Sequence, residues 1–407
     1  MAITNNKPSL AKRLDRIQPS PSIAANALVT ELKEQGRDII NFTLGEPDLD
    51  TPAHILQAAK DAMCSGDTHY TPSLGTTALR QAIVEKLTRD NRLNYDVSEI
   101  VVGSGGKHVI YHAFAATLNV GDEVIVPTPY WVSYPDIALL NDATPIFVET
   151  SFATGFKLLP EQLEEAITPN TKWLVLNTPN NPSGAVYSSS ELSALADILR
   201  RHPHVWVLSD EIYEHFVYAP AKHVSPLNVA PDLRDRTLIL NGVSKGYAMT
   251  GWRIGFGAGP RRLIAAIGKL ISQTTTCPSS ISQAAAVAAF SGDQSPIDHM
   301  RRIYQERRDF VHSRLSAIEG LSCEMPDGAF YIYLDVSDLL GRVTPDQHVL
   351  KNDADVVAYF LESAGVAMVS GRAYGQSPFI RMSFASSETM LERGCLAIKK
   401  ACQSLRF

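Results

Sequence analysis

Runs of apolar residues alternate with amphipathic segments through most of the chain. Four runs have the length and composition of fully buried strands, and they span residues 123–126, 171–176, 205–208 and 237–240. Between the second and third runs, Leu192, Leu195 and Leu199 recur at helical spacing, after Ser188 and Glu191 in a capping-box arrangement. Buried strands separated by amphipathic helices are typical of sheets covered on both faces. The pattern therefore predicts an α/β fold with a mostly parallel central sheet.

The pattern changes near residue 300. Before it, further elements are predicted as helices over 23–35, 77–89 and 108–118 and as strands over 38–44 and 100–102. Beyond it, we expect helices over 301–315 and 353–363, a strand over 329–334, and a half-buried strand with alternating polarity over 379–384. This change predicts a large domain over 49–300, a smaller α+β domain assembled from 19–48 and 301–407, and an N-terminal arm over 1–18.

Composition and charge exclude several classes of protein. The 407 residues carry a net charge of −6 with no basic block, which argues against nucleic acid as a partner. No apolar run is long enough to span a bilayer, and the N-terminus lacks the apolar core of a signal peptide, so we expect no membrane partner. The five scattered cysteines are typical of a cytoplasmic protein with reduced thiols, and no histidine spacing suggests a metal site.

Polar and aromatic side chains follow the ends of the four apolar runs. They are Trp131, Asn181, Asp210 and Lys245, in the order of the runs. In open α/β sheets, ligands bind beyond the carboxyl ends of parallel strands. We therefore expect these four side chains to share one site.

Lys245 has neighbours that suit a reactive amine. It lies between Ser244 and Gly246, and Arg253 follows eight residues later. A lysine among small residues at the edge of a sheet loses part of its hydration, which lowers its pKa and frees the amine as a nucleophile. A hydroxyl and a guanidinium nearby suit a phosphate. Together they indicate a Schiff-base lysine for pyridoxal phosphate, although by its position alone a surface lysine in a loop is the commoner outcome.

A glycine-rich loop, residues 103–107, joins a short strand to a helix. Its N–H groups and the helix N-terminus both favour an anion such as phosphate. A P-loop needs glycine in place of Val101 and serine or threonine in place of His108, and a dinucleotide fingerprint needs a third glycine that the loop lacks. The loop therefore indicates phosphate binding outside those two families.

Four of these side chains each have a functional and a structural interpretation. Asp210 could hold a pyridine nitrogen protonated or cap a turn. Tyr213 could donate a hydrogen bond to a ring oxygen or fill the core. Asn181 could also donate to the ring oxygen, or it could mark a turn. Trp131 could stack on an aromatic ring or pack internally.

The two arginines also have alternatives. Arg253 could bind phosphate or be exposed to solvent. Arg381 lies within an apolar strand, where an unpaired guanidinium is costly, so it needs an anion. That anion is either a protein carboxylate, the commoner case, or the carboxylate of a substrate.

Several motifs together resemble one family. Ser244-Lys245 with Arg253, together with residues 129–131, 180–184 and 209–213, occurs in the order found in class I aminotransferases. The Gly-Gly-Lys of the phosphate loop is similar to that of the bacterial aspartate aminotransferase branch. The resemblance extends from about residue 19 to residue 400.

The resemblance implies pyridoxal phosphate fold type I and a homodimer with sites at the subunit interface. It implies that Lys245 is the Schiff-base and acid–base lysine, that Asp210 pairs with the pyridine nitrogen, and that Tyr213 takes part in catalysis. The implied cofactor-binding residues also include Gly105, Gly106, Trp131, Asn181, Tyr213, Ser244, Arg253 and Tyr70 of the partner subunit. The implied substrate-binding residues are Gly45, Lys107, Trp131, Asn181, Arg381 and Ser20.

The resemblance further implies ping-pong transfer of an amino group from L-aspartate to 2-oxoglutarate, giving oxaloacetate and L-glutamate. Lys107 and Ser20 would receive the distal carboxylate. An aromatic or broad-specificity aminotransferase, including one that uses prephenate as acceptor, stays open, as does, less favoured, a β-lyase. A non-catalytic regulator with this fold is disfavoured, because such proteins usually carry a DNA-binding domain and only about twenty residues precede the fold here.

Overall fold

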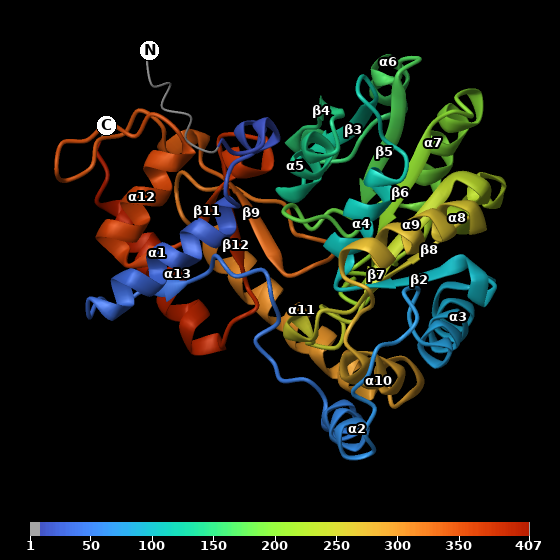
Figure 1. Cartoon of the computed structure of the whole chain (residues 1–407). Coiled ribbons are helices and arrows are strands. Elements are labelled where there is room, and N and C mark those ends of the chain that lie inside the picture. Colours follow the sequence, from blue (N-terminus) through green and yellow to red (C-terminus); the bar gives the residue numbers. More distant parts are fainter. Residues whose placement is uncertain (1–8, 407) are drawn as a thin grey trace, which may run out of the picture.

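The apolar runs form a seven-stranded central sheet in this computed structural model, which describes residues 9–406 (Figure 1). The strand order is β2-β8-β7-β6-β5-β3-β4. The strands are β2 Ile100–Gly103, β3 Glu123–Thr128, β4 Thr144–Glu149, β5 Thr171–Asn177, β6 Trp206–Asp210, β7 Thr237–Gly242 and β8 Gly255–Ala258. Only β8 runs antiparallel to its neighbours, so the predicted mostly parallel sheet is confirmed.

The register of the parallel strands brings their carboxyl ends together. Asn177 at the end of β5 is paired with Asp210 at the end of β6, and Asp210 is paired with Leu240 near the end of β7. Lys245 follows β7 after a few residues. The polar residues that follow separate apolar runs therefore lie at one edge of the sheet.

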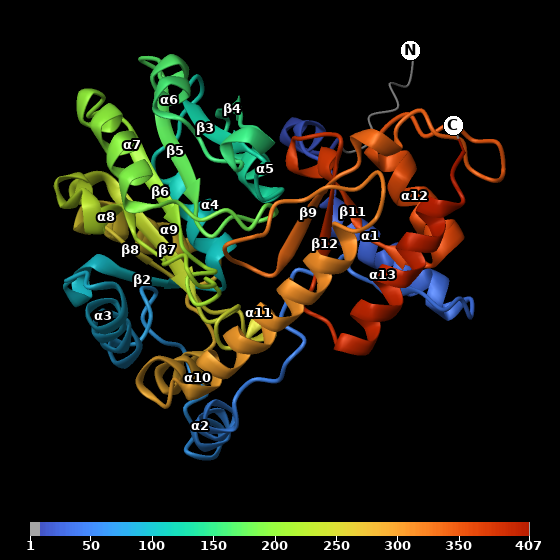
Figure 2. The same ribbon diagram turned by 180° about the vertical axis from the view of Figure 1, so that it is seen from behind.

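Helices cover both faces of this sheet (Figure 2). They are α2 Ala53–Cys64, α3 Thr77–Asn91, α4 Gly106–Ala115, α5 Ser133–Leu140, α6 Pro160–Ala166, α7 Ser189–Arg201, α8 Pro226–Val229, α9 Arg261–Thr274 and α10 Ser280–Ser291. One core packs Leu174 and Val207 against α3, α7 and α10, and the other packs Val175 and Leu208 against α4, α5 and α9. The predicted capping box starts α7, because Ser188 and Glu191 bond reciprocally.

A second region is built from segments near both ends of the chain. Its elements are α1 Pro21–Glu34, β1 Ile40–Asn41, α11 Ser295–Leu315, β9 Tyr331–Asp335, α12 Asp353–Ala364, β10 Val366–Ala367, β11 Val369–Ser370, β12 Phe379–Ser383 and α13 Glu388–Gln403. Strands β11, β12 and β9 form an antiparallel sheet, while β1 pairs with β10. Short 3-10 helices join elements of both regions: η1 Lys12–Arg16, η2 Val97–Glu99, η3 Phe152–Thr154, η4 Pro231–Arg236, η5 Thr250–Trp252, η6 Ser337–Leu339 and η7 Gly371–Tyr374.

Three sequence expectations need correction. The strand over 379–384 was expected to be half-buried, but β12 is buried along its whole length because Ile380 and Met382 pack into one hydrophobic cluster while Phe379 packs into another. The strand expected over 38–44 is reduced to β1, two residues long. Strands β4 and β8 were not predicted, since proline in the edge strand β4 and two glycines in β8 weaken the strand pattern.

We propose that the chain divides into the two domains expected from its sequence. A separate hydrophobic core supports this division, because it packs Phe42 and residues from α11 to α13 around β9 and β12. The proposed boundary at residue 300 falls inside α11, which Figure 1 shows running between the two regions. The N-terminal arm lies partly outside the described residues. Within residues 9–406, no helix is both long and apolar enough to cross a membrane.

Candidate active site

A cavity of about 500 Å³ lies at the carboxyl edge of the central sheet, where it meets the second region. The predicted site residues that line it are Ser20, Gly45, Gly106, Lys107, Trp131, Asn181, Asp210, Tyr213, Ser244, Lys245, Arg253 and Arg381. Gly105 and Tyr70 do not line it. The fold thus brings together side chains that lie far apart in the sequence.

Lys245 is a half-buried residue that lines this cavity. Its Nζ donates a hydrogen bond of 2.6 Å to the carbonyl oxygen of Gly45. Burial lowers the pKa of Lys245 to about 8, although the carboxylate of Glu46 opposes this effect. The amine is therefore far easier to deprotonate than that of a lysine in water, as a nucleophile requires.

Asp210 stabilises a turn and also lines the cavity. Its Oδ1 accepts a hydrogen bond of 3.2 Å from the backbone N–H of Ile212, which stabilises a turn. Its Oδ2 accepts a hydrogen bond of 2.6 Å from the hydroxyl of Tyr134, and the residue lines the cavity. Burial raises the pKa of Asp210 to about 6. The carboxylate is thus poised to pair with a cationic nitrogen.

Arg381 lies in the cavity wall with a buried guanidinium. Nη1 donates to Oδ1 of Asn181 at 3.1 Å, and Nη2 donates to the carbonyl oxygen of Thr43 at 2.6 Å. Its Nε is buried without a hydrogen-bond partner. Among residues 9–406, no carboxylate forms an ion pair with it, so the alternative of a protein carboxylate is not found. A guanidinium in this state fits a carboxylate ligand.

The groups that suit phosphate converge at the N-terminus of α4. Gly105 has a φ of +92°, and a Cβ there would lie 2.3 Å from Nη2 of Arg253. Arg253 is held by a hydrogen bond of 2.9 Å from Nη1 to the carbonyl oxygen of Thr250. Ser244 and Gly106 line the cavity beside it. A helix N-terminus, a hydroxyl and a guanidinium together fit a phosphate dianion.

Lys107, Trp131 and Ser20 also line the cavity. The Nζ atom of Lys107 is 4.9 Å from the centroid of the Trp131 ring. Burial and the charge of Arg253 lower the pKa of Lys107. Ser20 is the residue before α1. Tyr70, by contrast, is 89% exposed in the single chain.

Sequence reasoning missed several residues of this site. Tyr331 shares a hydrogen bond of 2.8 Å with the hydroxyl of Tyr213, and the guanidinium of Arg381 lies 4.5 Å from the Tyr331 ring. Tyr134 is the missed hydrogen-bond donor to Asp210. Asn177 ends β5 and also lines the cavity, so its position at a strand end was a usable signal. The two tyrosines carry no such signal.

The fold and the cavity define a class of protein: the pyridoxal phosphate enzymes of fold type I. A buried lysine, a buried carboxylate and a phosphate cradle fit the aldehyde, the ring nitrogen and the phosphate of that cofactor. Residues 37–398 match the family model described as "Aminotransferase class I and II". The chain therefore belongs to this family and is a pyridoxal phosphate-dependent transaminase, and the resemblance drawn from its motifs is confirmed.

Individual relatives are similar over nearly their whole length. The chain is 48% identical to the aspartate aminotransferase of Rhizobium meliloti (strain 1021), over 97% of this chain and 96% of the relative. It is also 48% identical to the aspartate/prephenate aminotransferase of Cereibacter sphaeroides, over 97% and 99%.

Solved structures agree with this relationship. The crystal structure of aspartate aminotransferase from Rhizobium meliloti has a TM-score of 0.96 and 47% identity, covering 98% of this chain and 100% of that one. The Thermus thermophilus enzyme with maleate has a TM-score of 0.91 and 39% identity, covering 97% and 100%.

The lowered pKa of Lys245 can be measured directly. We expect acylation of Lys245 in the cofactor-free protein to reach half its maximal rate near pH 8, because only the deprotonated amine reacts. Brief labelling with acetic anhydride across a pH series, followed by mass spectrometry of peptides, gives this rate. The exposed Lys351 in the same digests serves as the control. Half-maximal labelling of Lys245 only above about pH 10 would contradict a desolvated amine.

Proposed function

We propose that this chain is an aspartate aminotransferase that moves an amino group between L-aspartate and 2-oxoglutarate. The observation that carries the proposal is that Arg381 of β12 and Lys107 of α4, two cations on different elements, both line this cavity. Two cations at different points suit a substrate with two carboxylates. The printed names of the relatives also support it, since they include aspartate aminotransferases and an enzyme with bound maleate, a dicarboxylate.

We assign the cofactor's phosphate to the cradle of Gly105, Gly106, Ser244 and Arg253. Asp210 would pair with the ring nitrogen and keep it protonated. When bound, the cofactor supplies a ring that withdraws electrons from the substrate's Cα.

Around the ring, three side chains would set its orientation. Tyr213 and Asn181 would contact the ring oxygen, and Trp131 would stack on the ring face. All three line the same cavity as Lys245, which supports this assignment.

Lys245 would carry the proton of the reaction. Its Nζ would hold the cofactor's aldehyde carbon and, when released as a free amine beside the substrate, would take up and return the proton of the substrate's Cα. Its lowered pKa, about 8, suits an acid–base group near neutral pH.

Arg381 would bind the substrate's α-carboxylate, with the backbone of Gly45 beside it. Lys107 and Ser20 would receive the distal carboxylate. A lysine binds as a point charge rather than a bidentate fork, so this end of the cavity tolerates other side chains. The name of the Cereibacter relative supports the alternative that prephenate also serves as amino acceptor.

We also propose that the protein works as a homodimer in the cytoplasm. The side chain of Tyr70 is 89% exposed, although in the family resemblance it reaches the phosphate of the other subunit. Exposure of a large aromatic ring suits a surface that a second chain covers. The five cysteines are unpaired, as in a reducing compartment.

The absorption spectrum of the purified protein tests the reaction. Adding aspartate without any oxo acid should abolish the band of the lysine-bound cofactor, because the amino group is transferred to the cofactor. Lys245→Ala should lose both this band and turnover. A variant that keeps both would exclude Lys245 as the catalytic lysine.

The same measurement with phenylalanine decides the substrate class. Loss of the band at much higher concentrations than with aspartate supports an acidic substrate. Equal loss with both amino acids would favour the aromatic or broad-specificity alternative. Prephenate, added to the aminated form, restores the band only if it is an acceptor.

Gly105→Ala should weaken pyridoxal phosphate binding by roughly tenfold or more, because the new methyl group would displace the guanidinium of Arg253. Gly121→Ala is the matched control: its φ is +94°, but no atom lies within 4 Å of the added Cβ. Fluorescence titration of the cofactor-free proteins gives both affinities. Equal losses would show that backbone strain alone is responsible.

Mixed dimers test the assignment of Tyr70 to the partner's site. Tyr70→Ala and Lys245→Ala should each be impaired, yet subunits exchanged between them should recover cofactor affinity and turnover at one site per dimer. That site combines Lys245 of one chain with Tyr70 of the other. No recovery, although mixed dimers form, would place Tyr70 outside the partner's site.

A further inference from the structure

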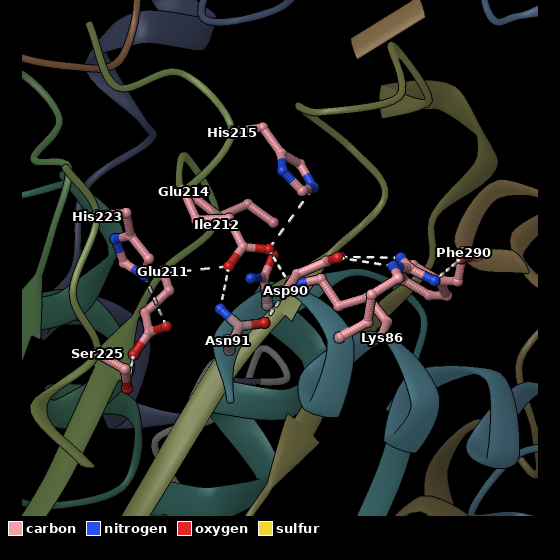
Figure 3. A network of polar contacts seen from close by, with 12 residues as sticks. Lys86, Asp90, Asn91, Glu211, Ile212, Glu214, His215, His223, Ser225 and Phe290 are labelled. Atoms are coloured by element: carbon pink, nitrogen blue, oxygen red, sulfur yellow. Dashed lines mark hydrogen bonds and ion pairs between the residues drawn. The ribbon is translucent and has the colours of Figure 1, made fainter. Parts of the chain in front are cut away.

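The segment that follows Asp210 has two sides with different surroundings. Ile212 and Tyr213 line the cavity. Glu211 and Glu214 belong instead to a buried polar network, which Figure 3 shows in close-up. Nothing in the proposed reaction uses this network, although one short segment connects it to the site.

Glu214 is held by the last two turns of α3. Lys86, 1% exposed, forms a buried ion pair with Oε1 of Glu214. Lys86 also donates to Oδ1 of Asn91 at 2.6 Å, and Nδ2 of Asn91 donates to Oε2 of Glu214 at 2.5 Å. Burial alone would raise the pKa of Glu214, but Lys86 together with the smaller effects of His215 and His223 holds the pKa well below its usual range. This carboxylate is therefore ionised and paired.

Glu211 is held on the other side of the segment. It accepts hydrogen bonds from the hydroxyls of Ser209 at 2.9 Å and Ser225 at 2.6 Å. Its Oε2 lies 3.0 Å from Nε2 of His223. Burial opposes a charge on His223, yet contact with Glu211 raises its pKa. Lys86 and His223 thus each lie against one of the two carboxylates.

The network also touches the backbone beside the reactive lysine. A Cβ on Gly246 would lie 2.1 Å from Cδ2 of His215, so the imidazole packs directly against that glycine. Nε2 of His215 is 3.6 Å from Oε1 of Glu214. Burial lowers the pKa of His215 to about 4, so the ring is neutral and acts through packing. Asp90 is the remaining charged group near it.

A metal ion is the other occupant that this chemistry could suit. Glu211, Glu214 and His223 offer ligand atoms within 4.8 Å of one another. The ammonium of Lys86 already contacts Glu214, and two hydroxyls already contact Glu211. Lys86 thus supplies the positive charge that a cation would bring.

We propose that the Lys86–Glu214 ion pair, which lies outside the cavity, holds the active-site residues in position. It fixes the segment that carries Asp210 and Tyr213, and through His215 it fixes the backbone next to Lys245. It also keeps the charge behind the cavity balanced. Lys86 and Glu214 are positioning residues, since they do not line the cavity. The inference rests on the proposed roles of Asp210 and Lys245.

Three variants test this proposal: Lys86→Met, Glu214→Gln and the two combined. The first leaves a buried carboxylate unpaired, the second leaves a buried ammonium unpaired, and the third leaves neither. The main readout is the pH midpoint at which the absorption band of the lysine-bound cofactor changes. This midpoint reports the charge around Lys245 independently of turnover.

The two single variants should shift this midpoint in opposite directions. An unpaired carboxylate stabilises a cation at Lys245, so Lys86→Met should raise the midpoint by roughly half a pH unit, and Glu214→Gln should lower it by a similar amount. The double variant should return close to the parent protein. We also expect kcat to fall about tenfold in each single variant with less change in KM, and to recover only in part in the double variant, which restores the charge balance but lacks the ion pair.

Glu85→Gln is the matched control, because it removes an exposed charge from the same helix. It should change neither the midpoint nor kcat. Shifts that are absent, or that share one direction, would overturn the proposal. If Lys86→Met does not fold, a lower midpoint in Glu214→Gln that is restored in the double variant still supports the proposal, and equal midpoints overturn it. A parent protein without the band would refute the proposed function instead.

Discussion

Burial of ionisable groups at the carboxyl edge of the parallel sheet is the constraint on which the rest of this structure depends. Parallel strands end at the same edge, so Asp210 and the residues after β7 meet there without any long loop. Each group is buried, and each therefore needs a partner of opposite charge or a shifted pKa. The structure supplies both kinds of compensation, but in different places.

Behind the cavity, compensation comes from the protein itself. Lys86 pairs with Glu214, and His223 lies 3.0 Å from Glu211, so each carboxylate has a protein partner before any ligand binds. Lining the cavity, Arg381 and Lys245 have backbone carbonyls and an amide as hydrogen-bond partners, and within residues 9–406 neither forms an ion pair. A buried cation with neutral partners is still stabilised by an anion. The cavity therefore lacks negative charge and favours anionic ligands.

The sequence predicted the fold class and most of the cavity, because both depend on local pattern. Buried runs and strand-end positions identify Trp131, Asn181, Asp210 and Lys245 without knowledge of contacts. Tyr134 was missed because its bond to Asp210 spans 76 residues, and the Lys86–Glu214 pair spans 128. Strand β12 was misjudged because burial of its second face depends on the packing around it, which alternation along one strand does not record.

The charged forms of Asp210 and Lys245 both lower the stability of the cofactor-free protein. Burial raises the pKa of Asp210 from 3.8 to about 6, so stability present below pH 4 is lost as the pH rises through 6. Burial lowers the pKa of Lys245 from 10.5 to about 8, so stability present above pH 10 is lost as the pH falls through 8. Near pH 7 both groups are charged, and each charge lowers the free energy of unfolding by about 3 kcal/mol. In the proposed assignment, a cofactor joined to Lys245 and paired with Asp210 would offset both losses. The same burial that makes the lysine reactive therefore couples cofactor binding to the stability of the fold.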